Sequence, residues 1–373
     1  MKPGSKKSVW MIGLSDQRRG GVASVLRTYR QASWFRAPDF ALIATCLPGN
    51  SWVRWMSAVR QFLGFAHRLS QQPPALLHIH LSSGASFWRK TPYLLTGHLH
   101  GIRLLINVHP SHFYDDYLTQ RRPVRWLIRR FLRLADAVGF ANPEMIPLFV
   151  DLLPGKRLCY LPNPIDLHRF RPGSKPQQKQ SPYALFLGAF FPQKGIAEIL
   201  TAAPAVLQAF PDFRFVLCGD GKSEGWKEQV DQSWRQHIDF RSWVDGDEKL
   251  ELLQNATALL LPSYSEGFPM IVSEAMACGV PVICSAVGGL VALLRNRHDA
   301  LLIPPKDARQ LQEALLHLLG DARLRADLRR YSLQSVKRFD VEGLLPYLQS
   351  LYTSLICSGG KTSSGFQPRP KSN

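Results

Sequence analysis

Two carboxylates, Glu266 and Glu274, stand eight residues apart and give the densest chemical signal in the sequence. An apolar run ends at Pro262, and the loop that follows it carries Glu266. A helix expected to start near Met270 carries Glu274. Carboxylates accept hydrogen bonds from neutral hydroxyl groups, and a sugar and a ribose both present such groups. The pair therefore predicts a segment that holds the two ends of a nucleotide sugar.

The residues Gly267, Phe268 and Pro269 come directly before this helix. Backbone N–H groups of the first two, and of the neighbours of Pro269, lie at the helix N-terminus. Unpaired N–H groups and the helix dipole favour an anion at such a position. We therefore expect this loop to bind the diphosphate of the nucleotide sugar.

Glycine turns follow three further apolar runs. Glycine lets the backbone approach a phosphate closely, because no Cβ stands in the way. After the second of these runs, 183–187, a cation, Lys194, also precedes Gly195. The turn 219–221 fits neither a P-loop nor a dinucleotide fingerprint, since the further glycines of those motifs are missing. The glycines of these turns are Gly20, Gly21, Gly188, Gly219 and Gly221.

The elements that must position these residues alternate between short apolar runs and helical segments. The runs are apolar along most of their length, which is typical of a parallel sheet with helices on both faces. The pattern predicts an α/β protein with two doubly wound domains, whose ligands lie beyond the carboxyl ends of the strands. The expected strands are 8–14, 76–81, 104–108, 137–140, 183–187, 213–218, 258–261, 280–285 and 300–303.

A proline-rich stretch, 162–182, interrupts this alternation and has the composition of a linker. We expect an N-terminal, acceptor-side Rossmann-like domain over 1–170 and a C-terminal, nucleotide-sugar-binding one over 171–340. A last helix, 341–356, is expected to pack back towards the N-terminal domain. The tail 357–373 is rich in Gly, Ser and Lys and is expected to be disordered.

The segment 262–281 resembles the donor-site signature of family 4 glycosyltransferases, retaining enzymes of the GT-B fold. In that signature two glutamates are separated by seven residues, and Gly-Phe-Pro follows the first. The resemblance extends over nearly the whole chain and is most specific in 183–305. It implies two Rossmann-like domains facing a central cleft. It also implies that Glu266 contacts the donor sugar and that Glu274 contacts the ribose.

The same resemblance implies where the diphosphate of the donor lies. Lys194 is expected to contact it, and Gly188 is expected to let the chain approach the donor. The turns 20–21 and 219–221 match glycine turns that the family places near the donor. Ala189 stands where the family commonly has an arginine, so one cation expected at the diphosphate is missing.

His109 ends an expected strand, at the edge of the sheet where ligands bind. The family often has a His-Gly motif here, with the histidine near the reacting end of the donor sugar, and His109 is expected to take this place although Pro110 replaces the glycine. The alternative is a histidine with a structural role only. For His78 and His80, in the preceding strand, we favour a structural role and expect His80 on the face of the strand's apolar residues.

The reaction that the resemblance implies is the transfer of a hexose-type sugar from a nucleoside-diphosphate sugar, with retention. It requires neither a metal nor a cofactor, and Lys194, Glu266 and His109 are the residues expected to act in it. The most similar members build polysaccharides, so the expected acceptor is a glycan, a lipid-linked molecule or another cell-envelope polysaccharide. A GT-B sugar-nucleotide epimerase and a non-catalytic nucleotide-sugar-binding protein are the alternatives.

The net charge of +18 lies mainly in the first half of the chain: residues 1–170 hold 23 Lys and Arg against 8 Asp and Glu, whereas residues 171–373 hold 23 against 20. Such a field favours an anionic partner, which we expect to be a membrane surface or a phosphorylated carrier. A charge that serves solubility alone is the alternative. Nucleic acid is not expected, since no binding module or aromatic stacking platform is recognisable.

The expected location is the cytoplasm, with peripheral contact to the inner face of the membrane. The six cysteines are scattered, which is typical of reduced thiols. The apolar stretch 9–14 is too short for an export signal, and no run of about 18 apolar residues could span a membrane. Arginines between 121 and 133 flank apolar residues at helical spacing, which suits either an anionic membrane or a solvated surface helix.

Overall fold

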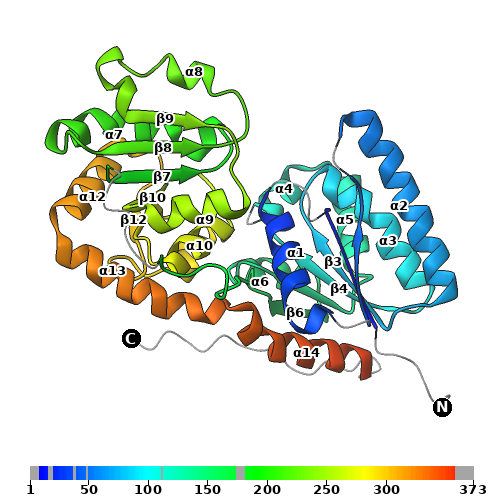
Figure 1. The fold of residues 1–373 in the computed structure, drawn as a ribbon. Helices are drawn as coiled ribbons and strands as arrows, with labels where there is room; N and C mark the ends of the chain where they lie inside the picture. Colours follow the sequence, from blue (N-terminus) through cyan, green and yellow to red (C-terminus); the bar gives the residue numbers. More distant parts are fainter. Residues whose placement is uncertain are drawn as a thin grey trace. The chain divides into compact units, whose positions relative to one another are not determined.

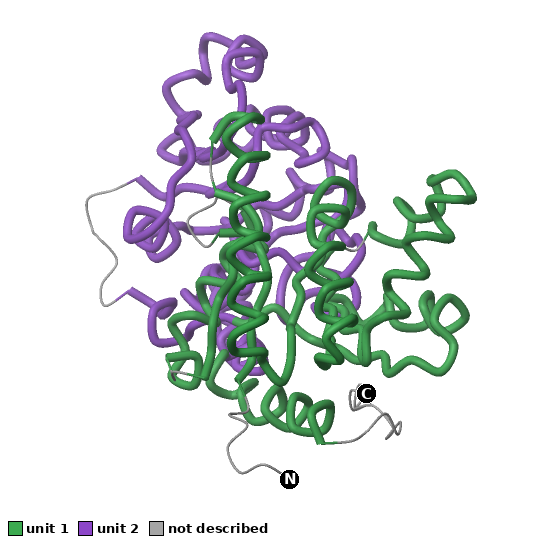
Figure 2. Tube along the Cα trace, turned by 90° about the vertical axis from the view of Figure 1, so that its right-hand side faces the viewer, with its two compact units in different colours: residues 1–164, 341–373 green, residues 165–340 purple. Residues whose placement is uncertain are grey.

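The computed structural model describes residues 8–15, 20–36, 39–47, 49–110, 112–173 and 181–357. The chain divides into two compact units (Figure 2): unit 1 holds residues 1–164 and 341–373, and unit 2 holds residues 165–340. Each unit contains one six-stranded sheet in which every paired strand is parallel. The predicted α/β class with two doubly wound domains is therefore confirmed.

The sheet of unit 1 has the strand order β2-β1-β3-β4-β5-β6. Its first strand, β1, lies beside the edge strand β2, and the later strands β3 to β6 follow on the other side of β1. The order therefore reverses between β1 and β3, and such a reversal leaves a crevice at the carboxyl ends of the two strands. The strands are β1 (Val9–Gly13), β2 (Phe40–Ala44), β3 (Leu76–Leu81), β4 (Arg103–Val108), β5 (Ala137–Phe140) and β6 (Arg157–Tyr160).

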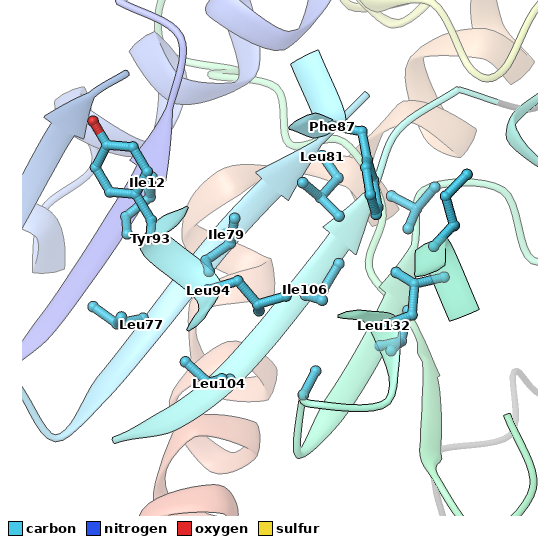
Figure 3. Close-up of a cluster of buried hydrophobic side chains, with 14 of the residues drawn as sticks. Ile12, Leu77, Ile79, Leu81, Phe87, Tyr93, Leu94, Leu104, Ile106 and Leu132 are labelled. Atoms are coloured by element: carbon cyan, nitrogen blue, oxygen red, sulfur yellow. The ribbon is translucent and has the colours of Figure 1, made fainter. Parts of the chain in front are cut away.

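Helices cover both faces of this sheet (Figure 1). On one face, alternate strand residues such as Leu77, Ile79 and Ile106 pack against side chains of α2, α3 and α5, including Tyr93 and Leu132 (Figure 3). The opposite face is covered by α1 and α14. The helices are α1 (Gly21–Gln31), α2 (Ser51–Gln71), α3 (Ala85–Leu99), α4 (Phe113–Thr119), α5 (Arg122–Leu132), α6 (Met145–Val150) and α14 (Val341–Cys357).

The sheet of unit 2 has the order β12-β11-β10-β7-β8-β9 and reverses between β7 and β10. Its residues alternate between two cores because successive side chains of a strand point to opposite faces. Leu185 belongs to the core that contains α10, whereas Phe186 belongs to the core that contains α7 and α12. The strands are β7 (Tyr183–Leu187), β8 (Arg214–Cys218), β9 (Ile238–Arg241), β10 (Ala258–Leu261), β11 (Val282–Ser285) and β12 (Leu301–Ile303).

In unit 2, α7 and α12 pack side by side on one face of the sheet, while α9 and α10 lie on the other (Figure 1). In the described part of this unit there are three 3₁₀ helices, η2 (Pro192–Lys194), η3 (Gln232–His237) and η4 (Val336–Phe339). The helices are α7 (Ile196–Ala209), α8 (Glu224–Lys227), α9 (Gly246–Asn255), α10 (Met270–Cys278), α11 (Gly289–Leu293), α12 (Ala308–Gly320) and α13 (Ala322–Ser335).

The boundaries of the units differ from the expected domain limits. The break falls between Pro164 and Ile165, not after 170, because Ile165 forms a bridge with Asp340 and is buried in the core of unit 2. The last helix runs to Cys357, which was expected in the tail, and it belongs to unit 1. The rest of the expected tail, 358–373, lies outside the described residues.

Candidate functional site

The candidate site in unit 2 lies at the point where the strand order of its sheet reverses. The loop after β7 carries η2 and Lys194, and the loop after β10 carries Glu266. The two loops are tied together, since the Tyr264 N–H donates to the Gln193 carbonyl at 2.9 Å. Parallel sheets bind ligands at such a reversal. The fold therefore brings together a cation and a carboxylate that are far apart in the chain.

Lys194 and Glu266 form an ion pair in this crevice. Lys194 Nζ donates to Glu266 Oε1 at 2.5 Å, and the Glu266 side chain is about one-tenth exposed. The carbonyl of Glu266 also accepts a hydrogen bond from the Gly289 N–H at 3.3 Å, which fixes its backbone against the start of α11. Both charges are thus held in place by the unit itself.

Gly195 is the reason that Lys194 can lie so close to the β10 loop. Its φ is +77°, a left-handed value that favours glycine. A Cβ at this position would lie 2.1 Å from the carbonyl oxygen of Pro262, a backbone atom that cannot rotate away. Only glycine therefore lets η2 pack against the end of β10.

The second carboxylate, Glu274, has a lysine partner that the sequence did not reveal. Lys249 of α9 donates to Glu274 Oε1 at 2.8 Å, and the side chains are 13% and 4% exposed. Lys249 also lies 5.2 Å from the centre of the Phe170 ring. No spacing rule links a lysine on one helix to a glutamate 25 residues later on another, so only the packing of α9 beside α10 could identify this pair.

The residues before α10 anchor this loop and begin the helix. The Phe268 side chain is buried and its ring lies 4.8 Å from that of Phe339, so it anchors the loop in the core. Pro269 is the N-cap of α10, and no side chain caps that helix end. This end of α10 is therefore the place where the sequence analysis expects an anion.

Two of the predicted glycines are explained by packing between neighbouring turns. A Cβ on Gly219 would lie 2.1 Å from the Gly188 carbonyl oxygen, so the turns after β7 and β8 fit together only without a side chain there. Gly221 has a φ of +110°, and the carbonyl of Asp220 accepts from the Phe190 N–H at 2.8 Å. These turns fix the loop that contains Ala189, which stands where a cation was expected.

The Asp245-Gly246-Asp247 sequence has the spacing of a metal-binding Asp-x-Asp motif but is used differently. Asp245 is the N-cap of α9 and accepts from the Gly246 N–H, while Asp247 lies 3.5 Å from the guanidinium of Arg169. Across the part of the chain that the structure describes, no group of three His, Cys, Asp or Glu side chains could hold a metal ion.

In unit 1, the predicted glycines lie at the N-terminus of α1, after β1. Gly20 has a φ of +117°, and Gly21 is the first residue of the helix. Among the described residues, no atom lies within 4 Å of a Cβ built on either glycine, so contacts with these residues require neither of them. The positive φ accounts for Gly20 alone.

His109 is 8% exposed, and the described structure engages both of its ring nitrogens. Nδ1 lies 3.1 Å from the acceptor Asn163 Oδ1 and therefore donates to it. Nε2 then accepts from His80 Nδ1 at 2.8 Å. Burial, followed by the charge of Lys90, lowers the pKa of His109 to about 3. The imidazole is thus neutral at physiological pH and oriented by two partners within unit 1.

The prediction for the face of His80 was wrong. Leu77, Ile79 and Leu81 of β3 lie in the core with α2 and α3, so His78 and His80 point to the opposite face, which α1 and α14 cover. There His78 Nδ1 lies 2.7 Å from the hydroxyl of Tyr352. The alternation of a strand requires this arrangement, since the histidines and the aliphatic residues occupy alternate positions.

A buried cation, Lys90, lies near these histidines. Its Nζ donates to Ser86 Oγ at 2.9 Å, and burial lowers its pKa to about 7. The charge of Lys90 contributes to the lowered pKa of both His80 and His109. The carboxyl ends of β3 and β4 therefore hold a group of bases.

Comparison with known proteins agrees with these features. The family "Glycosyl transferases group 1" matches residues 169–335, which include every predicted site residue of unit 2. A putative teichuronic acid biosynthesis glycosyltransferase of Bacillus subtilis is 32% identical over 297 residues, covering 74% of this chain and 70% of the relative. The chain spans only about half of the length, 48%, of two other curated relatives that it matches.

Two further similarities concern an enzyme of lipid-linked sugars and a solved structure. The N,N'-diacetylbacillosaminyl-diphospho-undecaprenol alpha-1,3-N-acetylgalactosaminyltransferase of Campylobacter jejuni is 27% identical over 293 residues, 73% of each chain. The structure of sucrose-phosphate synthase from Thermosynechococcus elongatus matches with a TM-score of 0.74 at 19% identity, covering 94% of this chain and 99% of the other. The second similarity supports the GT-B fold. The Bacillus relative, together with the matched region of unit 2, shows that this chain belongs to the glycosyl transferases group 1.

Proposed function

We propose that this protein transfers a hexose-type sugar from a nucleoside-diphosphate sugar to a cell-envelope acceptor, with retention at the anomeric carbon. The observation that carries the proposal is the ion pair of Lys194 and Glu266 at the strand reversal of unit 2. It supplies a cation for the diphosphate and, beside it, a carboxylate for a sugar hydroxyl. Glu274, which lies about one turn into α10, is the proposed partner of the ribose hydroxyls.

The proposed chemistry is electrostatic. The bond between the anomeric carbon and the diphosphate oxygen breaks, and the electron pair leaves with the nucleoside diphosphate. Lys194 and the N–H groups before α10 stabilise this negative charge, which is the larger part of catalysis in such a reaction. The acceptor oxygen forms the new bond on the same face of the sugar, and its proton passes to the departing phosphate oxygen. No covalent enzyme intermediate, metal or cofactor takes part.

His109 is proposed to act near the reacting end of the sugar as a neutral, oriented imidazole. Its hydrogen bonds to His80 and Asn163 fix the ring, and its lowered pKa keeps the ring uncharged. A neutral ring does not repel the positive charge that develops at the anomeric carbon. This role is positional, because both nitrogens already have partners in unit 1.

The acceptor is proposed to be a glycan or a lipid-linked saccharide. Two relatives are named for teichuronic acid synthesis and for a diphospho-undecaprenol substrate, which are both cell-envelope molecules. The excess of positive charge in residues 1–170 favours an acceptor with phosphate groups, or one presented at an anionic membrane. We propose that the protein acts in the cytoplasm, at the inner face of that membrane.

A panel of nucleotide sugars tests the donor site directly. The sugar nucleotide that fits should raise the melting temperature of the wild-type protein, because a ligand that binds only the folded state stabilises it. The same donor should be consumed when a lipid-linked or glycan acceptor is added, and equally so in the presence of EDTA. Glu228→Gln changes an exposed glutamate of unit 2 and serves as the control for Glu266→Gln.

Three results would point elsewhere. Interconversion of the donor into its epimer would identify an epimerase. Binding of a donor that is never hydrolysed or transferred with any acceptor would indicate a non-catalytic binding protein. If no nucleotide sugar shifted the melting temperature, the donor site itself would be wrong.

A further inference from the structure

Helix α2 carries a row of apolar side chains that faces solvent. We call this row the α2 stripe. The residues recur at helical spacing on one side of the helix, and their exposed fractions lie between 43% and 67%. The rings of the two tryptophans stack on each other, with centroids 5.6 Å apart. The stripe consists of Trp52, Trp55, Met56, Val59 and Leu63.

The residues of the α2 stripe do not hold the helix on the sheet of unit 1. The helix attaches to the sheet through the opposite side of its second half, where Phe65 and Leu69 are buried in the core. Its first six residues, 51–56, are all exposed, so this end stands clear of the core. Folded proteins seldom expose contiguous apolar surface of this kind unless it contacts a partner or a membrane.

The charges around the stripe narrow the choice of partner. No Asp or Glu occurs between Asp39 and Asp115, whereas six Lys or Arg do. Of these six, Lys90 is buried and Arg103 pairs with Asp136. The three arginines of α2 itself are exposed along the same helix: they are Arg54, Arg60 and Arg68.

The neighbouring helices α3 and α5 also carry exposed apolar side chains, and α5 adds arginines. α3 packs between α2 and α5 on one face of the sheet, and all three contribute to the same core (Figures 1 and 3). On the outer side of α3, Leu99 is 75% exposed. On α5, Trp126 is exposed beside a cavity of about 340 Å³. That cavity is lined by Trp126, Arg129, Arg130, Arg133 and Leu134.

From these observations we propose that the α2 stripe inserts into the interface of an anionic lipid bilayer. Tryptophan suits this position, because its ring is apolar while its N–H bonds to water or headgroups. Arg60, which flanks the stripe at helical spacing, and the arginines of α5 would then contact lipid phosphates, as in helices that lie in the membrane plane. The inference deepens the membrane contact of the proposed function and depends on the surface of unit 1 alone.

A second copy of the chain is a poorer occupant of the stripe. A symmetric contact would bring the arginines of two α2 helices together, with no acid on the helix to offset them. An anionic bilayer instead satisfies the apolar rings and the charges at once. A bilayer is therefore the occupant to which the proposal commits.

Binding to lipid vesicles tests the proposal on the full chain. The protein is sedimented with vesicles of phosphatidylcholine alone and of phosphatidylcholine with phosphatidylglycerol, and tryptophan emission is recorded with and without brominated lipid. We expect binding to the anionic vesicles only, with a blue shift and quenching by bromine. Trp52→Ser with Trp55→Ser should lower the partition coefficient at least tenfold and remove most of the quenching.

Two further variants separate the contribution of charge from that of apolar side chains in general. Arg60→Gln with Arg130→Gln, which changes one exposed arginine of α2 and one of α5, should weaken binding about tenfold and reduce its dependence on salt. The control is Leu148→Ser with Val150→Ser, which removes two exposed apolar side chains of α6 and should leave binding unchanged. All variants should keep the circular dichroism spectrum of the wild type.

Three outcomes of the vesicle experiment distinguish the membrane proposal from its alternatives. Equal binding of the wild type and the tryptophan variant, or no binding of the wild type, would overturn the proposal. A concentration-dependent dimer that the tryptophan variant loses would assign the stripe to self-association instead. The shift of melting temperature by a nucleotide sugar depends on unit 2, so failure of the donor site would be seen separately in the same samples.

Discussion

The ammonium of Lys194 lies 2.5 Å from a carboxylate oxygen of Glu266, so the two proposed donor-binding groups neutralise each other. The Lys194 ammonium has two further N–H donors for a diphosphate, and Glu266 has a second carboxylate oxygen for a sugar hydroxyl. A phosphate that shares Lys194 draws positive charge away from Glu266, which makes the carboxylate a stronger acceptor. Binding of the two ends of the donor is thereby coupled through the ion pair.

Replacement of Glu266 tests the sugar contact. Glu266→Gln preserves the shape of the side chain but weakens its acceptor character, and we expect transfer to fall on the order of 10²-fold or more. The melting temperature should change little, since Lys194, which loses its charged partner, is 30% exposed and can be solvated. Near-normal turnover would show that Glu266 is not part of the site. The surface variant Glu228→Gln is the control and should transfer sugar at the rate of the wild type.

Replacement of Lys194 tests the phosphate contact. Lys194→Met removes a charged donor, so affinity for a nucleoside diphosphate should fall about tenfold to a hundredfold. Affinity for the free nucleoside should stay the same, because it has no phosphate for Lys194 to bind. Calorimetric titration with both ligands measures the difference. An equal loss for both would mean that Lys194 only maintains the loop.

The pair of Lys249 and Glu274 should matter for stability as well as for binding. Lys249→Met leaves a carboxylate that is 4% exposed without its partner, at a cost of about 3 kcal/mol. Adding Glu274→Gln to this variant should recover most of that loss, since no uncompensated charge remains. Urea unfolding of the two variants gives the comparison. Additive losses in the double variant would contradict a direct pairing.

Gly195 gives a prediction about the backbone. Gly195→Ala would place a Cβ against the Pro262 carbonyl and strain a φ of +77°, so we expect a loss of about 2 kcal/mol and weaker donor binding. Gly225→Ala is the matched control, because Gly225 lies in a helix with open space around it. Equal melting temperatures for both variants would show that the loop can move aside.

Acid should destabilise unit 1 through its buried histidines. Burial lowers the pKa of His78 and of His109 to about 3, and that of His80 well below its ordinary value. The unfolded chain therefore binds more protons between about pH 6.5 and pH 3, so stability is full above this window and falls as the pH decreases through it. The melting temperature is measured as a function of pH for the wild type and for the double variant His78→Gln with His80→Gln, and the two values should converge at low pH. A constant difference in melting temperature at every pH would refute the lowered pKa of these histidines.

The central strands of both sheets could be predicted from the sequence, but three edge strands could not. β2, β6 and β9 border their sheets and contain residues that are only partly buried. A strand covered on every side reads as a continuous apolar run, whereas an edge strand mixes polar and apolar residues and resembles a loop.

The candidate site shows a similar division. Glu266, Glu274 and Lys194 lie in motifs whose order along the chain is enough to identify them. The pairing of Lys249 with Glu274 and the contact of His80 with His109 depend on which elements pack together. No local sequence pattern therefore predicts either contact. Lys249 is the charged side chain that the packing of α9 beside α10 brings to Glu274.

Helix α14 has a consequence for how the protein is made. It follows all of unit 2 in the chain, yet it completes unit 1, where Tyr352 contacts His78 and Glu342 accepts from Ser33. On the ribosome, residues 165–340 are complete before this helix emerges. Unit 2 can therefore fold during translation as one continuous segment, whereas the first 164 residues have only α1 on one face of their sheet until α14 has been synthesised.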